Sequence, residues 1–168
     1  SQIISDKTLN AISSRLYKAN VAELRIVNDW ESCMRFAKEA LSCGKFSIAQ
    51  NVLSKSLIYK EDWKALQGMG ICHAKNDNMK EAIRFLERSI KIKRNSNSFE
   101  TLGQAYYVLG KYKLAIKAIK ASLSLKNTNR LYKIVGSSYM KLENYAEAII
   151  YFKKALNYKR EYDTLNSL

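Results

Sequence analysis

The 168-residue sequence contains no proline, one histidine, three cysteines and six glycines. Because His73 is the only histidine, a histidine-rich metal site is excluded. The cysteines are odd in number and form no CxxC pair, which argues against a disulfide framework. We therefore expect Cys33, Cys43 and Cys72 to be packing residues of a protein in a reducing, cytoplasmic setting.

Long apolar runs are also missing. No stretch approaches the roughly 20 apolar residues that a helix needs to span a bilayer, and the N-terminus lacks the pattern of a secretory signal. These absences predict a soluble protein. The chain begins with Ser1 rather than methionine, which leaves both a removed leader and a larger parent protein open.

Acidic residues are scarce relative to basic ones. The chain has 29 Lys and Arg against 15 Asp and Glu, a net charge of +14. Residues 1–62 hold nine basic and seven acidic residues, whereas residues 63–168 hold twenty and eight, a difference of +12. Glu100 is the one acid between Arg88 and Arg130. Because like charges at this density repel each other, we expect them on solvated faces, and an acidic partner would relieve the repulsion.

Catalytic signatures are absent as well. The sequence has no catalytic triad, carboxylate pair or glycine-rich phosphate loop. The segment from Gly68 to Gly70 lacks a preceding strand and falls inside a predicted helix, so it does not meet the requirements of a phosphate-binding turn. His73 stands where later copies of the same segment have Tyr106 and Tyr139, which indicates packing. We expect no enzymatic activity, no catalytic residue, no cofactor and no metal.

The feature that is present is an internal repeat with a fixed period. The clearest markers are the evenly spaced alanines Ala49, Ala82, Ala115 and Ala148. Turn positions with the same spacing are Gly44, Asp77, Gly110 and Glu143. The capping pattern Asn-x-x-Glu predicts helix starts at Asn28/Glu31, Asn78/Glu81, Asn97/Glu100 and Asn144/Glu147. A fixed period of this length indicates a solenoid, in which each repeat packs against its neighbours.

The repeated residues, among them Leu102-Gly103 followed by Tyr106 and Ala115, resemble those of the tetratricopeptide repeat (TPR). This resemblance implies an all-α, TPR-like α-solenoid of four helix-turn-helix repeats. We place the repeats at residues 30–62, 63–95, 96–128 and 129–161. Residues 1–29 would form an N-terminal helix that is a cap, a degenerate repeat or a connector. Residues 162–168 would begin a truncated C-terminal capping helix. The family repeat is typically one residue longer and usually carries a proline, so this chain departs from it in both respects.

The resemblance also implies a concave groove lined by the first helix of each repeat. The matching positions are Lys38, Lys64, Gln67, Lys75, Asn97, Gln104, Tyr107, Arg130, Lys133 and Lys141. We therefore predict a non-catalytic protein–protein interaction module, an adaptor, scaffold or chaperone-like protein that binds a peptide segment of an acidic partner. One TPR subgroup binds acidic C-terminal tails through a clamp that includes an asparagine, and this chain has Lys38 at that position.

A second surface is predicted on the second helices of the middle repeats. We call it the basic outer ridge, and it comprises Lys80, Arg84, Arg88, Lys91, Lys113, Lys117 and Lys120. It favours an alternative function, that of a nucleic-acid-associated protein. The tyrosines fall mostly at repeat-core positions, which predicts no aromatic platform for bases. A further alternative is a regulatory or output module of a larger signalling protein. The absence of a capping helix after the last repeat predicts self-association through that repeat.

Overall fold

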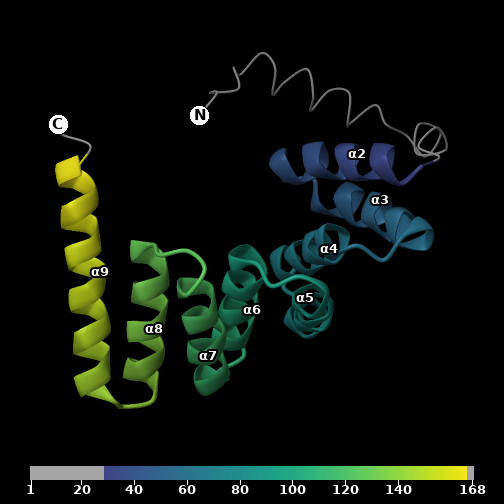
Figure 1. Ribbon diagram of the computed structural model, residues 1–168. Helices are drawn as coiled ribbons and strands as arrows, with labels where there is room; N and C mark the ends of the chain where they lie inside the picture. The colour runs from purple at the N-terminus through teal and green to yellow at the C-terminus, as the bar shows by residue number, and fades with distance from the viewer. Residues whose placement is uncertain (1–28, 166–168) are drawn as a thin grey trace.

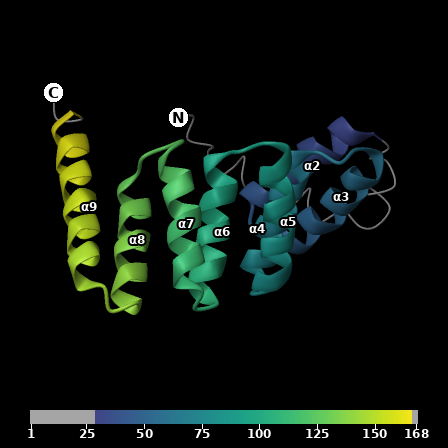
Figure 2. The same cartoon turned by 60° about the horizontal axis from the view of Figure 1, so that its bottom comes forward.

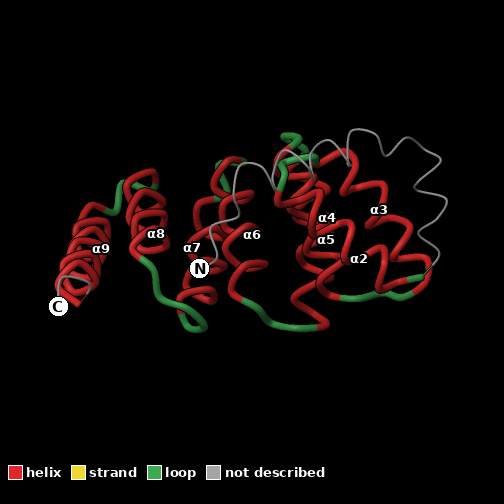
Figure 3. Tube along the Cα trace, turned by 90° about the horizontal axis from the view of Figure 1, so that it is seen from above, coloured by secondary structure: helices red, strands yellow, loops and turns green. Residues whose placement is uncertain are grey.

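The computed structural model describes residues 29–165, and its regular elements there are all α-helices (Figure 3). Residues 1–28, most of the predicted N-terminal helix, lie outside the described residues. The eight helices of the described part are α2 (Trp30–Ser42), α3 (Phe46–Tyr59), α4 (Trp63–Lys75), α5 (Met79–Ile92), α6 (Ser96–Val108), α7 (Tyr112–Leu123), α8 (Asn129–Lys141) and α9 (Tyr145–Leu165). They follow one another in chain order from α2 at one end to α9 at the other (Figures 1 and 2).

Each repeat is a pair of helices, α2–α3, α4–α5, α6–α7 and α8–α9, and each pair packs on the next. The alanines that mark the repeat lie where the two helices of a pair meet, and all four are at most 2% exposed. In the later repeats, a glycine of the first helix allows the two helices to approach closely. A Cβ atom at Gly103 would lie 2.5 Å from the side chain of Ile119 in the partner helix. The predicted all-α solenoid is confirmed.

The turn inside each repeat has the same left-handed backbone conformation. The φ angles are 67° at Gly44, 57° at Asp77, 72° at Gly110 and 59° at Glu143. This conformation ends a helix and reverses the chain. The four turns therefore give every repeat the same hairpin, whether or not the residue is glycine.

The N-caps seen in the structure agree only in part with the caps that the Asn-x-x-Glu pattern predicts. Asn78 and Asn144 accept the backbone N–H of Glu81 and Glu147 as predicted. The first helices of the repeats are instead capped by residues that recur at the repeat spacing, Asp29, Asp62, Asn95 and Thr128. Asn97 was therefore the wrong cap for α6. Asn95 is extended and accepts the N–H of Ser98 at 2.8 Å, so the helix has already begun at Ser96. The other predicted cap, Asn28, lies outside the described residues.

The last helix is longer than the others. It runs for 21 residues without interruption, so residues 162–165 extend α9, although the sequence predicts the start of a separate helix there. The segment contains no glycine or proline that would end the helix. Within the described residues, no helix is both long and apolar enough to cross a membrane.

Candidate binding groove

The first helices of the repeats, α2, α4, α6 and α8, contact one another in succession. A hollow of about 730 Å³ lies between α2 and α4. Its apolar lining includes Trp30, Met34 and Trp63, and Lys38 and Lys64 line it as well. Trp63 is further held by cation–π contacts, with the Lys64 ammonium 5.6 Å from the ring centre. This first hollow can accept an aromatic or aliphatic side chain beside an acidic group.

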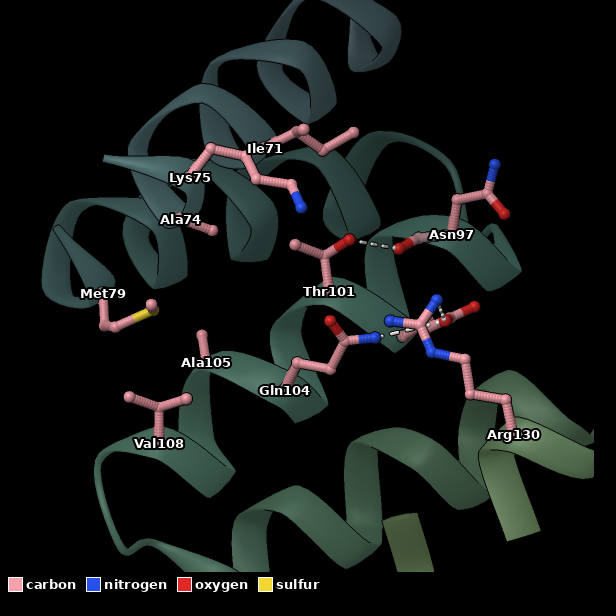
Figure 4. A pocket seen from close by; sticks show the side chains of 11 residues that line it. Ile71, Ala74, Lys75, Met79, Asn97, Thr101, Gln104, Ala105, Val108 and Arg130 are labelled. Atoms are coloured by element: carbon pink, nitrogen blue, oxygen red, sulfur yellow. Dashed lines mark hydrogen bonds and ion pairs between the residues drawn. The ribbon is translucent and has the colours of Figure 1, made fainter. Parts of the chain in front are cut away.

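A second hollow, of about 360 Å³, lies between α4 and α6 and reaches Arg130 (Figure 4). Met79 and Val108 lie at one side of it, whereas Gln104 and Arg130 lie at the other. Glu100, whose side chain is 22% exposed, accepts a hydrogen bond from Gln104 Nε2 at 3.1 Å and pairs with Arg130 Nη1 at 3.2 Å. The guanidinium is therefore already engaged by a carboxylate of the protein itself.

A third hollow, of about 390 Å³, lies between α6 and α8. It is lined by Tyr107, Lys133 and Ile134, together with Gln104 and Arg130, which also line the second hollow. The Tyr107 ring packs edge-on against Tyr112 at 5.5 Å between centres, which orients it. Because they share three residues (Gln104, Arg130 and also Val108), the second and third hollows form one continuous groove.

Comparison with known proteins places this arrangement in a known class. Residues 75–155, slightly less than half of the chain, match the family of anaphase-promoting complex, cyclosome, subunit 3. A search of curated protein sequences found no match. Solved structures of MamA are similar: one has a TM-score of 0.79 at 24% identity and covers 95% of this chain and 91% of its own. The chain therefore has the TPR-like α-solenoid fold that its sequence predicts.

Two further MamA structures agree with this assignment. A second crystal structure has a TM-score of 0.76 at 23% identity, over 95% of this chain and 85% of its own. The structure of MamA from Desulfovibrio magneticus RS-1, starting at its residue 41, has a TM-score of 0.74 at 20% identity, over 94% of this chain and 98% of its own. At these identities the likeness concerns the fold.

Nine of the ten groove residues predicted from the sequence line the three hollows. They are Lys38, Lys64, Gln67, Lys75, Asn97, Gln104, Tyr107, Arg130 and Lys133. Lys141 is exposed at the last position of α8 and lines none of them. The prediction missed Trp30 and Trp63. Their signal was an Asp-Trp pair that recurs at the repeat spacing and places a tryptophan directly after the helix cap.

The seven residues of the basic outer ridge are all exposed, on α5 and α7. Three of them have partners. Arg84 pairs with Glu81 at 2.6 Å and Arg88 with Glu61 at 2.8 Å. Lys120 Nζ donates to the Tyr139 hydroxyl at 3.0 Å, and this bond raises the pKa of Lys120. The ridge is therefore a positively charged surface. On α5 two of its arginines form ion pairs, whereas no ridge residue of α7 forms an ion pair with another described residue.

The histidine and cysteines take packing positions. His73 stacks on Phe85 with ring centres 5.3 Å apart and lies 3.3 Å from the side-chain nitrogen of Gln50. Cys33 and Cys72 are buried, and burial raises the pKa of Cys72 to about 11. Between Asp29 and Leu165 no three potential metal ligands among His, Cys, Asp and Glu come together.

Proposed function

We propose that this protein is a non-catalytic interaction module that holds a peptide segment of an acidic partner protein in the concave groove, as an adaptor, scaffold or chaperone-like protein. One observation carries the proposal. The three hollows follow one another along α2, α4, α6 and α8, and each combines apolar side chains with at least one lysine or arginine. A single extended or helical segment with alternating apolar and acidic residues fits such a series.

The polar groups of the groove support the same interpretation. Gln104 lies at the junction of two hollows and can bond the main chain of a bound peptide. Lys133 and Lys75 line hollows and form no ion pair among the described residues, so they are available to acidic side chains. Complementary charge would speed association and select against basic partners.

The test is a pull-down from a nuclease-treated lysate of the source organism with three forms of the chain. The wild type should retain a discrete protein, and the variant Gln104→Ala/Lys133→Ala should lose it. The matched control Lys113→Ala removes the same charge from the outer side of α7 and should retain the protein. Loss of the retained protein in the control, or its retention by the groove variant, would contradict the proposal.

A second candidate is a nucleic-acid-associated protein that uses the basic outer ridge. It is favoured by Lys113 and Lys117, which are exposed and form no ion pair among the described residues. Contacts to phosphates weaken steeply with salt, whereas a groove-bound peptide with apolar anchors should persist at about 0.5 M salt. Retained material that disappears with nuclease and is indifferent to the groove variant would favour the ridge.

A further inference from the structure

A fourth hollow, of about 610 Å³, lies outside the concave groove series, where the connection from α7 to α8 meets the C-terminal half of α9. Its lining comprises Lys126, Asn127, Thr128, Asn129, Arg130, Tyr158, Lys159 and Tyr162. Three of these residues are cations and none is a carboxylate. By contrast, the linings of the first and second hollows include Glu31 and Glu100. The fourth hollow is therefore a cationic site with two aromatic side chains.

Local contacts build this hollow. Tyr158 donates its hydroxyl to the Asn127 carbonyl at 3.0 Å and so ties α9 to the connection. The side-chain oxygen of Asn129 is buried and has no hydrogen-bond partner among the residues that the structure describes. Tyr162 lies one helical turn beyond Tyr158 and is 60% exposed. Lys126 and Lys159 are both exposed. The cations and the ring of Tyr162 can therefore reach a ligand from solvent.

Half-buried tyrosines continue from this hollow across the fourth repeat. Tyr158 lies 6.3 Å from Tyr132, Tyr132 lies 6.4 Å from Tyr151, and Tyr151 lies 5.6 Å from Tyr139, between ring centres. Lys120 lies 5.2 Å from the Tyr151 ring centre. We call these four tyrosines the tyrosine strip. The sequence placed them at core positions, yet the structure joins them into one aromatic and cationic strip that starts at the hollow.

We propose that the fourth hollow binds one nucleotide of a single-stranded nucleic acid, whose neighbouring nucleotides pass along the tyrosine strip. A phosphate would lie between Lys126 and Lys159, and the base would stack on Tyr162. Proteins that bind single strands combine these two elements, cations that neutralise the backbone and aromatic rings on which unpaired bases stack. Arg130 is left out of the phosphate site because it already pairs with Glu100.

Three properties favour a single strand over a duplex or a free nucleotide. The bases of a duplex are stacked on one another and cannot offer a face to Tyr162. A free nucleotide would occupy the hollow alone. The tyrosine strip offers further aromatic rings beyond the hollow, which only a longer strand could contact. Residues 63–168 also carry a net charge of +12, from twenty basic and eight acidic residues, which suits a polyanion. The fourth hollow shares Arg130 with the peptide groove, but Lys126, Lys159 and Tyr162 line only the fourth hollow, so either proposal can fail without the other.

The experiment measures fluorescence anisotropy of labelled oligothymidylate about fifteen nucleotides long, a size within the range of single-strand sites. The full chain should bind it more tightly than a duplex of the same length and more tightly than thymidine monophosphate. Tyr162→Ala should lower the affinity about tenfold, because one base loses its stacking partner. Lys126→Ala/Lys159→Ala should lower the slope of log K against log salt by about 0.7, the contribution of one neutralised single-strand phosphate.

The matched control is Lys60→Ala/Lys111→Ala, which removes two exposed charges that belong neither to the ridge nor to any of the four hollows, and it should change the affinity less than twofold. All altered side chains are exposed, so circular dichroism should show unchanged helix content. Equal binding of duplex and single strand, equal competition by polyglutamate, or equal losses in the two lysine variants would overturn the proposal. Affinity for thymidine monophosphate equal to that for the oligonucleotide would overturn the role of the tyrosine strip.

Discussion

At the scale of single residues, the four turns share one backbone conformation and differ in residue type. Left-handed φ angles cost a non-glycine residue about 1–2 kcal/mol, and Glu143 has a φ of 59°. Glu143→Gly removes this cost from the folded state but also makes the unfolded chain more flexible, which offsets part of the gain. We therefore expect the substitution to raise the free energy of unfolding by about 1 kcal/mol. Gly110→Ala should lower it by about 1 kcal/mol. A Cβ atom there would meet nothing within 4 Å, so the loss would come from the backbone alone.

Urea denaturation followed by circular dichroism measures both changes. Lys117→Gly, in the middle of α7, is the control and should lower the free energy of unfolding by about 1 kcal/mol, as glycine does in a helix interior. If Glu143→Gly were destabilising to the same extent, backbone strain at the turn would not be the relevant quantity.

A second residue-scale prediction concerns Tyr106. Burial, and then its hydrogen bond of 2.6 Å to the Glu87 carboxylate, raise the pKa of Tyr106 from 10.0 to about 12. Between these values the unfolded chain loses the proton while the folded chain keeps it. The stabilisation is therefore complete below pH 10 and is lost as the pH rises through 12. We expect the difference in unfolding free energy between the wild type and Tyr106→Phe to shrink from pH 9 to pH 12.

Urea titrations at a series of pH values test this expectation. Tyr59→Phe, at a side chain that is 48% exposed, serves as the control and should differ from the wild type by a constant amount. A constant difference for Tyr106→Phe as well would show that the Tyr106 hydroxyl does not titrate differently in the two states.

At the scale of the helices, two repeats share a buried hydrogen bond that the last one lacks. Ser89 Oγ donates to the Trp63 carbonyl at 2.8 Å, and Ser122 Oγ to the Ser96 carbonyl at 2.9 Å, so the end of the second helix is tied to the start of the first. The equivalent residue in the fourth repeat is Ala155, which is 2% exposed. We expect Ala155→Ser to raise the free energy of unfolding by about 1 kcal/mol and Ser122→Ala to lower it by about 1 kcal/mol.

Thermal and urea unfolding of both variants provide the measurement. The exposed Ser124, whose hydroxyl donates to the Ala121 carbonyl in its own turn, gives the control Ser124→Ala, and its effect should stay below about 0.5 kcal/mol. A destabilising Ala155→Ser would mean that the fourth repeat has no room for the hydroxyl, in contrast to the second and third.

The same scale shows what the sequence could and could not predict. The repeat period predicted the helix pairs, because Ala82 and Ala115 occupy crossings that admit only small side chains. Local capping patterns were less reliable. Asn97 matched the pattern as well as Asn78 did, and only the backbone of Asn95 decides where α6 begins. The sequence does not predict the fourth hollow, because its pattern places Tyr162 in a separate helix. In the structure α9 continues through Tyr162 and brings this side chain beside the connection from α7 to α8.

For the groove, the repeat period predicts which residues line it but not which side chains bond to one another. Nine of the ten residues line hollows because any residue at those positions faces the inner side of a first helix. The pairing of Glu100 with Arg130 depends on side-chain geometry between α6 and α8, which the period does not contain. The signal for Trp30 and Trp63 was present in the sequence, at the start of the first two repeats.

At the scale of the whole molecule, the last repeat exposes the apolar face that earlier repeats cover. Ile116 on α7 is 8% exposed beneath α8, whereas Ile149, its equivalent on α9, is 54% exposed. Leu156 is 58% exposed on the same helix, although its equivalent Leu123 is packed into the core. Within the described residues, no helix follows α9 to cover this face. An apolar face of this kind favours association.

We therefore expect the chain to self-associate through α9 and sedimentation velocity to show a mass that rises with concentration. Ile149→Glu/Leu156→Glu should abolish the rise without loss of helix content, because both side chains are already exposed. The matched control Ile58→Glu/Ile92→Glu places two acidic residues at other exposed isoleucines, on α3 and α5, and should leave association unchanged. A monomer at the highest concentration reached by the wild type would rule the interface out. Two added glutamates lower the net charge of +14 and so weaken the repulsion between copies wherever they are placed. Equal loss in both variants would therefore contradict an interface on α9, because it would depend neither on that face nor on net charge.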